Sequence, residues 1–235
     1  DASNKLGTQM KATGEVMSIG RTMEESLLKA VRSLETGVCH IYHKKFDKWS
    51  NDDLLAYIKG GTDDRLYAIG QLIRNGVDLA LIYDKTKIDM FFLEKFKNIV
   101  EFENVVRAHP MDVETLRAAK RMGFSDKYIG QLWGLSQNEM YRLREKNNVF
   151  PVYKMIDTCA SEFASYVPYF YSTYEEENES IVSGKEKIIV LGSGPIRIGQ
   201  GVEFDYSTVH AIWSIRAAGY EAIIINNNPE TVSTD

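Results

Sequence analysis

The chain has 235 residues, of which 44% are hydrophobic and 11% aromatic, so it can bury the cores of one or two domains. Its 28 lysines and arginines against 33 aspartates and glutamates give a net charge of −5, which disfavours a general nucleic-acid binder. A transmembrane run, a signal peptide and a disulfide framework are all absent from the sequence, which has only Cys39 and Cys159, so we expect a reduced, cytosolic protein.

Helical patterns fill most of the first 148 residues. Residues 1–22 hold three glycines and little apolar material, and we interpret them as the tail of a larger unit. A helix over about residues 23–36 begins after Thr22, carries Glu24 and Glu25 in its first turn and ends at Gly37. Further helices are predicted over residues 54–58, 62–75, 89–107, 112–122, 125–133 and 136–147. The first of these would be capped by Asn51 or Asp52, and the expected caps of later ones are Thr62, Asp112, Ser125 and Ser136. Gly123 and Gly134 would end two of the helices. Residues 47–148 show no strand pattern, which indicates an all-helical domain.

The pattern changes after Pro151. Residues 152–156 alternate weakly between apolar and polar side chains, and residues 167–174 are rich in aromatic ones, so both should be extended. The acidic residues 175–179 that come next are typical of a solvated linker.

A second architecture begins near residue 185. Residues 188–191 form a continuous apolar run, a glycine-rich loop comes after it, and a helix over about 205–218 leads to another apolar run at 222–225. This order predicts the first βαβ unit of a doubly wound domain. One such unit cannot bury both faces of its sheet, so we expect a domain cut through, with apolar strand faces that are disordered or covered by a neighbouring molecule.

The loop GSGPIRIGQG at residues 192–201 is the strongest chemical signal in the residues themselves. Glycines there could let the backbone approach a phosphate, or could simply permit tight packing between strand and helix. Gly192, Gly194 and Gly199 are spaced differently from a nicotinamide-binding loop, and no Lys-Ser or Lys-Thr follows Gly201 as in a phosphate-binding P-loop. Both interpretations remain open at this point.

Two acidic residues fall in loops at the same expected sheet edge. Glu203 comes after the glycine loop, and Glu230 comes after the second strand. They could line a polar path or be ordinary solvated acids. A metal site is not predicted: Cys39, His40 and His43 lack a second Cys/His pair at zinc spacing, so a local cluster is the better interpretation.

Residues 112–147 allow a rival function. Three short helices with glycines at their turns resemble a helix-turn-helix, and the last one carries Arg142, Arg144 and Lys146. Glu139 and Glu145 interrupt this basic face. DNA binding by residues 112–147 is therefore the alternative hypothesis to a compact helical subdomain.

Three blocks of sequence carry a resemblance that covers nearly the whole chain. They are GTQMK and GEVMSIGR at residues 7–11 and 14–21, then PVYK, DTCA and YSTYE between residues 151 and 175, and finally VLGSGP, RIGQGVEFDY and NPETVSTD between residues 190 and 235. Together they resemble the large subunit of carbamoyl phosphate synthetase. The resemblance implies a mainly α fold, a helical oligomerisation domain followed by the first βαβ unit of an α/β pre-ATP-grasp domain.

The resemblance also implies a division and a function. Residues 1–22 would end the first, carboxyphosphate-forming ATP-grasp half, residues 23–184 would form the helical oligomerisation domain, and residues 185–235 would begin the second half, truncated. The parent would make carbamoyl phosphate for arginine and pyrimidine synthesis from bicarbonate, glutamine-derived ammonia and two ATP with Mg²⁺ or Mn²⁺, beside a glutaminase small subunit.

For this chain the family resemblance implies no catalytic residue, no bound cofactor and no activity of its own. It implies self-association through the helices, and a place for Glu203 and Glu230 in the wall of a carbamate tunnel. Neither a nucleic acid nor a membrane is an expected partner.

Overall fold

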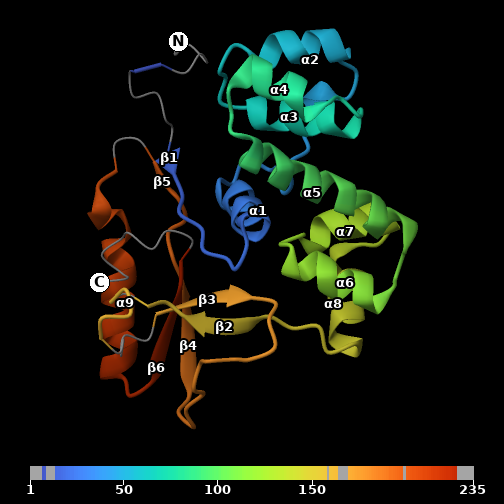
Figure 1. The fold of residues 1–235 in the computed structure, drawn as a ribbon. Coiled ribbons are helices and arrows are strands. Elements are labelled where there is room, and N and C mark those ends of the chain that lie inside the picture. Colours follow the sequence, from blue (N-terminus) through green and yellow to red (C-terminus); the bar gives the residue numbers. More distant parts are fainter. Residues whose placement is uncertain (1–6, 9–13, 158, 164–168, 198–199, 227–235) are drawn as a thin grey trace.

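The computed structural model describes residues 7–8, 14–157, 159–163, 169–197 and 200–226 (Figure 1). A helical domain comes first, and strands dominate the remainder of the chain. The helical elements of the first domain are α1 (Met23–Ser33), the short 3-10 helix η1 (Lys44–Phe46), α2 (Asn51–Ile58), α3 (Arg65–Arg74), α4 (Leu79–Thr86), α5 (Met90–Ala108), α6 (Val113–Arg121), α7 (Asp126–Trp133) and α8 (Gln137–Lys146).

Helix α5 is the central element of this domain. It runs between two groups of shorter helices, with α2–α4 beside its first part and α6–α8 beside its last part (Figure 1). Its inward face repeats at helical spacing through Leu93, Phe96, Ile99, Val100 and Val106, all of them buried in a core shared with α1–α4 and α6–α8. One long amphipathic helix therefore holds both groups together.

Capping residues set most helix boundaries as predicted. Thr22 caps α1, and the side chains of Asp112, Ser125 and Ser136 accept backbone N–H groups at the starts of α6, α7 and α8. Two predicted caps are wrong. Ser50 rather than Asn51 or Asp52 caps α2, and α3 begins after Asp64 rather than at Thr62. The intervening residues form a turn held by Asp64, whose carboxylate accepts hydrogen bonds from Tyr57 and Lys45.

Helix α4 is not among the helices that the sequence predicts. It lies inside the interval between the helices predicted over 62–75 and 89–107, and its only fully buried side chain is Ile82. A helix with one inward residue leaves almost no periodic signal.

Two strands come after the helices as predicted. β2 (Val152–Met155) pairs antiparallel with β3 (Phe170–Thr173). The acidic linker is exposed, but it also binds the free edge of β2. The Tyr153 N–H donates to Asn178 Oδ1, the Glu179 N–H donates to the Tyr153 carbonyl, and the Met155 N–H donates to the Glu179 carboxylate. The linker thus covers backbone groups that an edge strand would leave open.

The α/β unit also forms as predicted. β4 (Lys187–Leu191) and β6 (Glu221–Ile225) are parallel neighbours, and α9 (Tyr206–Ala217) crosses between them (Figure 1). The mainly α fold followed by a βαβ unit is therefore confirmed. The strands are paired rather than disordered because α9 packs against them on one side.

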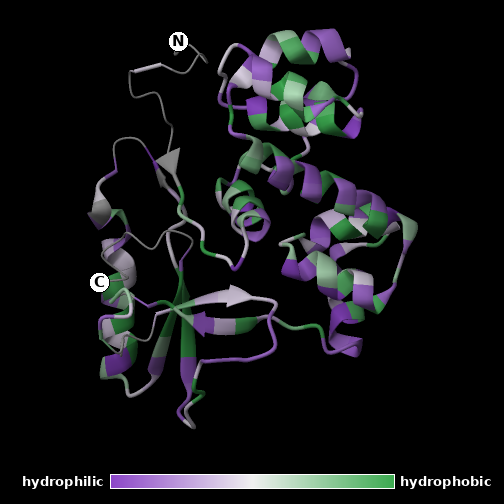
Figure 2. Ribbon diagram, in the orientation of Figure 1, coloured by the Kyte–Doolittle hydropathy of each residue, from purple (hydrophilic) through white to green (hydrophobic). Residues whose placement is uncertain are grey.

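The second face of this strand pair is exposed. Ile189 lies opposite Ile223 and Leu191 opposite Ile225 in the register, and the exposed fractions of these four side chains run from 37% to 76%. Figure 2 shows the apolar character of both strands. That a neighbouring molecule covers this apolar face of β4 and β6 stays a prediction.

A last, short strand pair joins a segment that precedes α1 to a segment of the glycine-rich loop. β1 (Gly14–Glu15) pairs antiparallel with β5 (Ile196–Arg197), which lies inside the glycine-rich loop. The 3-10 helix η2 (Val202–Asp205) then leads into α9. Among the helices of the described ranges, none is both long and apolar enough to cross a membrane.

Candidate functional site

The carboxyl ends of β4 and β6 form the edge at which the glycine loop begins. The Gly192 N–H donates to the Ile225 carbonyl over 2.7 Å, so the first residue of the loop extends the ladder of the sheet. A Cβ atom on Gly192 would come within 2.7 Å of Asn226 Cγ. A larger residue at this position would therefore have to displace the side chain of Asn226.

A buried carboxylate accepts a hydrogen bond from the side-chain amide of Asn226. Asp205, at the end of η2, is fully buried, and its Oδ2 accepts a hydrogen bond of 3.3 Å from Asn226 Nδ2. Thr208, in the first turn of α9, is buried as well. The start of α9 and the end of β6 are thereby tied together directly behind the glycine loop.

The middle of the loop lies against Glu35, which comes two residues after the end of α1. Gly194 has a φ of +85°, a conformation that favours glycine, and a Cβ there would lie 3.4 Å from a carboxylate oxygen of Glu35. The Arg197 guanidinium forms an ion pair of 3.6 Å with the same carboxylate. Both side chains are more than half exposed, so this pair orients the loop and adds little stability.

Glu203 fills the space beside the last glycine of the loop. Its carboxylate occupies the position that a Cβ on Gly201 would take, and the residue itself is exposed in η2. The open sides of Gly192, Gly194 and Gly201 thus face Asn226, Glu35 and Glu203. At Gly192 and Gly201 a Cβ would collide with its neighbour, which supports the packing interpretation of these two glycines.

Two of the predicted site residues, Gly199 and Glu230, lie outside the described residues. The proximity of Glu203 to Glu230 therefore stays a prediction. Sequence reasoning did not single out Asp205, although it lies in the block RIGQGVEFDY, and it missed Glu35, which follows α1 and lies more than 150 positions before the loop. The available signals for Asp205 were its place in that block and its position directly before a helix.

The histidine cluster has a structural role. His40 is buried, stacks on Tyr128 with ring centroids 3.7 Å apart, and hydrogen-bonds Glu103 through Nε2 over 3.0 Å. Burial lowers the pKa of His40, so the ring is neutral and donates this bond. His43 instead accepts the Lys45 N–H at the start of η1. The described residues contain no group of side chains suited to hold a metal ion.

Glu103 is the charged centre of the core. The Arg74 guanidinium meets its carboxylate with two hydrogen bonds, Nε to Oε2 over 2.9 Å and Nη2 to Oε1 over 2.5 Å. Burial alone would raise the pKa of Glu103, but hydrogen bonds from His40 and Arg74 outweigh it and lower the pKa to about 2. The carboxylate is ionised and paired, as buried charges must be.

The helix-turn-helix alternative receives no support. Arg144, a key member of the expected basic face, is buried and binds Asp126 over 2.9 Å. Lys120 binds the other oxygen of Asp126 over 2.8 Å, and burial lowers the pKa of Lys120 to about 8. Two cations of the three-helix segment therefore stabilise its interior instead of facing a partner.

Comparison with protein-family models gives two matches, in chain order. The model described as the carbamoyl-phosphate synthetase large chain, oligomerisation domain, matches residues 15–148, which is more than half of the chain. The model described as the carbamoyl phosphate synthase preATP-grasp domain matches residues 184–235. The first match contains α1–α8, and the second contains β4–β6 with the glycine loop.

Proposed function

The chain belongs to the carbamoyl-phosphate synthetase large-chain family, and on that premise we propose that it is the scaffold between the two synthetase halves of an ATP-dependent ligase. The parent enzyme makes carbamoyl phosphate from bicarbonate, ammonia released from glutamine by a small subunit, and two ATP. Its product serves arginine and pyrimidine synthesis.

The proposed division of the chain assigns residues 1–22 to the first half, 23–184 to the helical domain and 185–235 to the second half. Packing supports the place of β2 and β3 in the helical unit, because the Thr173 hydroxyl donates to the buried Glu25 carboxylate of α1 over 2.8 Å. In this proposal the helical domain joins copies of the protein. Exposed apolar side chains on α4 and α5, among them Tyr83, Phe91 and Phe92, offer a surface for that association.

One observation carries the second role, a path for carbamate. Gly14 pairs with Arg197 and Glu15 with Ile196, so the segment that enters from the first half lies beside the glycine loop of the second half. Glu203 is exposed and comes six residues after Arg197 in the sequence. We assign Glu203 and Glu230 to the wall of the path, where enclosure would protect an unstable intermediate from water. In this proposal Arg197, which is paired with Glu35, supplies a cation to the path.

In this proposal the glycine loop holds neither the nucleotide nor its metal; the side chains beside Gly192 and Gly201 support this. ATP with Mg²⁺ or Mn²⁺ supplies phosphoryl transfer in the parent, and no residue of this chain is assigned a step in it. We therefore predict that the 235-residue chain alone is inactive. Bicarbonate-dependent release of ADP by the purified chain would contradict this.

Glu203→Gln in a large chain that contains this segment tests the path. The substitution keeps the size of the side chain and removes its charge. We expect bicarbonate-dependent ATP hydrolysis to persist while the yield of carbamoyl phosphate per ATP falls. Glu186→Gln, an exposed carboxylate at the opposite end of β4, is the matched control and should leave the yield unchanged. An equal yield in both variants and the unmodified enzyme would refute the path.

A further inference from the structure

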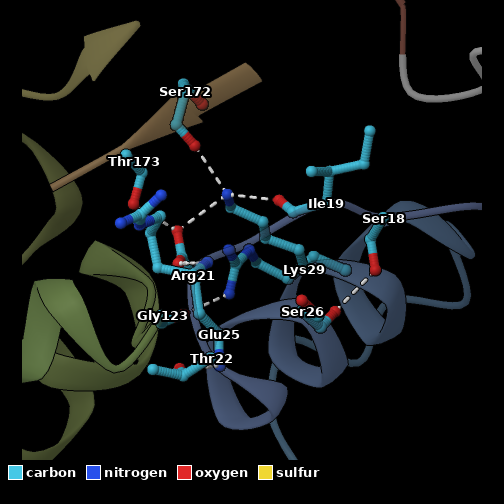
Figure 3. Close-up of polar contacts among 11 residues, drawn as sticks. Ser18, Ile19, Arg21, Thr22, Glu25, Ser26, Lys29, Gly123, Ser172 and Thr173 are labelled. Atoms are coloured by element: carbon cyan, nitrogen blue, oxygen red, sulfur yellow. Dashed lines mark hydrogen bonds and ion pairs between the residues drawn. The ribbon is translucent and has the colours of Figure 1, made fainter. Parts of the chain in front are cut away.

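Two segments meet at a single buried carboxylate: residues 18–22, which lead into α1, and strand β3, which comes after the helices (Figure 3). We call these two segments the connections. Glu25 on α1 is 1% exposed. Its Oε2 accepts the backbone N–H of Arg21, from the entering segment, over 2.7 Å. Its Oε1 accepts the hydroxyl of Thr173, from β3, over 2.8 Å. One side chain thus binds residues that lie far apart in the sequence.

The ammonium of Lys29 completes the arrangement. Its Nζ forms an ion pair of 2.8 Å with Glu25 Oε1 and donates to the carbonyls of Ile19 over 2.8 Å and Ser172 over 2.6 Å. An ammonium has three N–H bonds, and Lys29 has three oxygen partners, one on each connection and one on its own helix. Figure 3 shows the Lys29 side chain reaching between the two connections.

Glycines make the close approach possible. A Cβ on Gly20 would lie 3.0 Å from Glu25 Cδ, so the entering segment rests directly against the carboxylate. On the other side, Gly123 has a φ of +93°, and a Cβ there would come within 2.9 Å of Glu25 Cα. The carbonyl of Gly123 also accepts a hydrogen bond from Arg32 of α1. Larger residues at either position would push these segments away from α1.

We propose that Glu25 and Lys29 form a joint that fastens residues 18–22 to β3, so that the two connections move with α1 as one body. The joint as such rests only on these contacts. Its consequence for the enzyme, a fixed relation between the segment from the first half and the strand that leads to the second half, rests on the proposed function. Through β1, the same entering segment reaches the glycine loop.

The neighbouring residue Glu24 separates this role from ordinary helix stabilisation. Glu24 is also buried in the first turn of α1, but its carboxylate binds Asn98 over 2.9 Å and Lys95 over 3.4 Å, both on α5. The partners of Glu24 therefore lie on the long helix α5, whereas those of Glu25 include a residue on each of the two connections. The two carboxylates are a matched pair for substitution.

Hydrogen exchange measured by mass spectrometry on the 235-residue chain tests the joint. Glu25→Gln removes the charge that holds Lys29 and weakens the acceptor for Arg21. We expect exchange in residues 18–22 and 170–173 to become about tenfold faster or more, as loss of a charge-assisted hydrogen bond implies. Exchange in α5 should stay unchanged. Glu24→Gln should leave both connections at the unmodified rate.

Lys29→Met removes the joint from its other side: it takes away the donor to the Ile19 and Ser172 carbonyls and leaves the buried Glu25 carboxylate without its charged partner, so circular dichroism first checks that the variant folds. This variant should speed exchange in the same two segments. The double variant Glu25→Gln/Lys29→Met leaves no unpaired charge, so it should unfold at a higher urea concentration than Glu25→Gln while both connections still exchange rapidly.

Two results would overturn the proposal. One is unchanged exchange in both connections when Glu25 or Lys29 is replaced in a folded chain. The other is acceleration of equal size in α5, which would make the pair a general stabiliser of the fold. Hydrogen exchange is measured without turnover, whereas the path for carbamate is tested by the yield of carbamoyl phosphate. Failure of the joint and failure of the path are therefore distinguished.

Discussion

Replacement of Glu103 by glutamine should destabilise the chain in a pH-dependent way. The pKa of Glu103 is lowered from its ordinary value of 4.5 to about 2, a difference of about 2.5 units. At about 1.4 kcal/mol per unit, the ionised carboxylate contributes on the order of 3 kcal/mol at neutral pH. Its side chain is only 2% exposed, so solvent screening reduces this little.

The sign of the pH dependence is set by proton linkage. Because the folded state binds a proton on Glu103 more weakly than the unfolded state does, the contribution is complete above about pH 5 and is lost as the pH falls towards 2. Glutamine cannot ionise, and it leaves the Arg74 guanidinium without its charged partner. The gap in unfolding free energy between the unmodified chain and Glu103→Gln should therefore be about 3–5 kcal/mol at pH 7.

Urea unfolding followed by far-ultraviolet circular dichroism measures this gap. The experiment is repeated between pH 7 and pH 3 on both proteins, so that titrations common to both cancel in the difference. We expect the gap to narrow steadily below about pH 5. A gap that stays constant with pH, or one below about 1 kcal/mol at pH 7, would refute the assignment of an ionised Glu103 at the centre of the core.

Two further predictions concern stability. Burial lowers the pKa of Lys120 to about 8, so the unfolded state binds more protons than the folded state between about pH 8 and pH 10.5. The free energy of unfolding should therefore rise with pH over that interval. Lys120→Met should abolish this rise, as measured by urea titrations at pH 8 and pH 10. Gly192→Ala should cost about 1–3 kcal/mol in thermal unfolding because its Cβ collides with Asn226, whereas Gly184→Ala, where a Cβ meets nothing within 4 Å, should cost far less.

Local sequence signals predict most of the helical domain correctly. Capping side chains at Thr22, Asp112, Ser125 and Ser136 act within three residues of themselves, so their hydrogen bonds can be anticipated from spacing. The same holds for the apolar face of α5. Helix α4 escapes prediction because a single buried residue gives no period to detect.

Long-range pairing cannot be predicted in the same way. β1 and β5 are two residues long and about 180 positions apart, and no pattern in either segment indicates the other. The sequence predicts Glu25 as a favourable charge near a helix start, which its position satisfies, but its bonds to Arg21 and Thr173 depend on how distant segments fold together.

The glycine loop is predictable in part, from its local spacing, and in part depends on distant residues. Its spacing is enough to argue against a nicotinamide site and a P-loop. Which groups occupy the space beside Gly192 and Gly201 depends on Asn226 and on the turn at Glu203, and only the folded chain shows them.

Joining copies of the protein is the main role that we propose for the helical domain of this chain. Sedimentation velocity over a concentration series tests it most directly, with Phe91→Ser/Phe92→Ser as the variant, because these rings are 53% and 43% exposed and their loss should not unfold α5. We predict that the unmodified chain sediments faster as its concentration rises and that the variant associates more weakly. A single monomeric species of the unmodified chain at the highest concentration would contradict the claim.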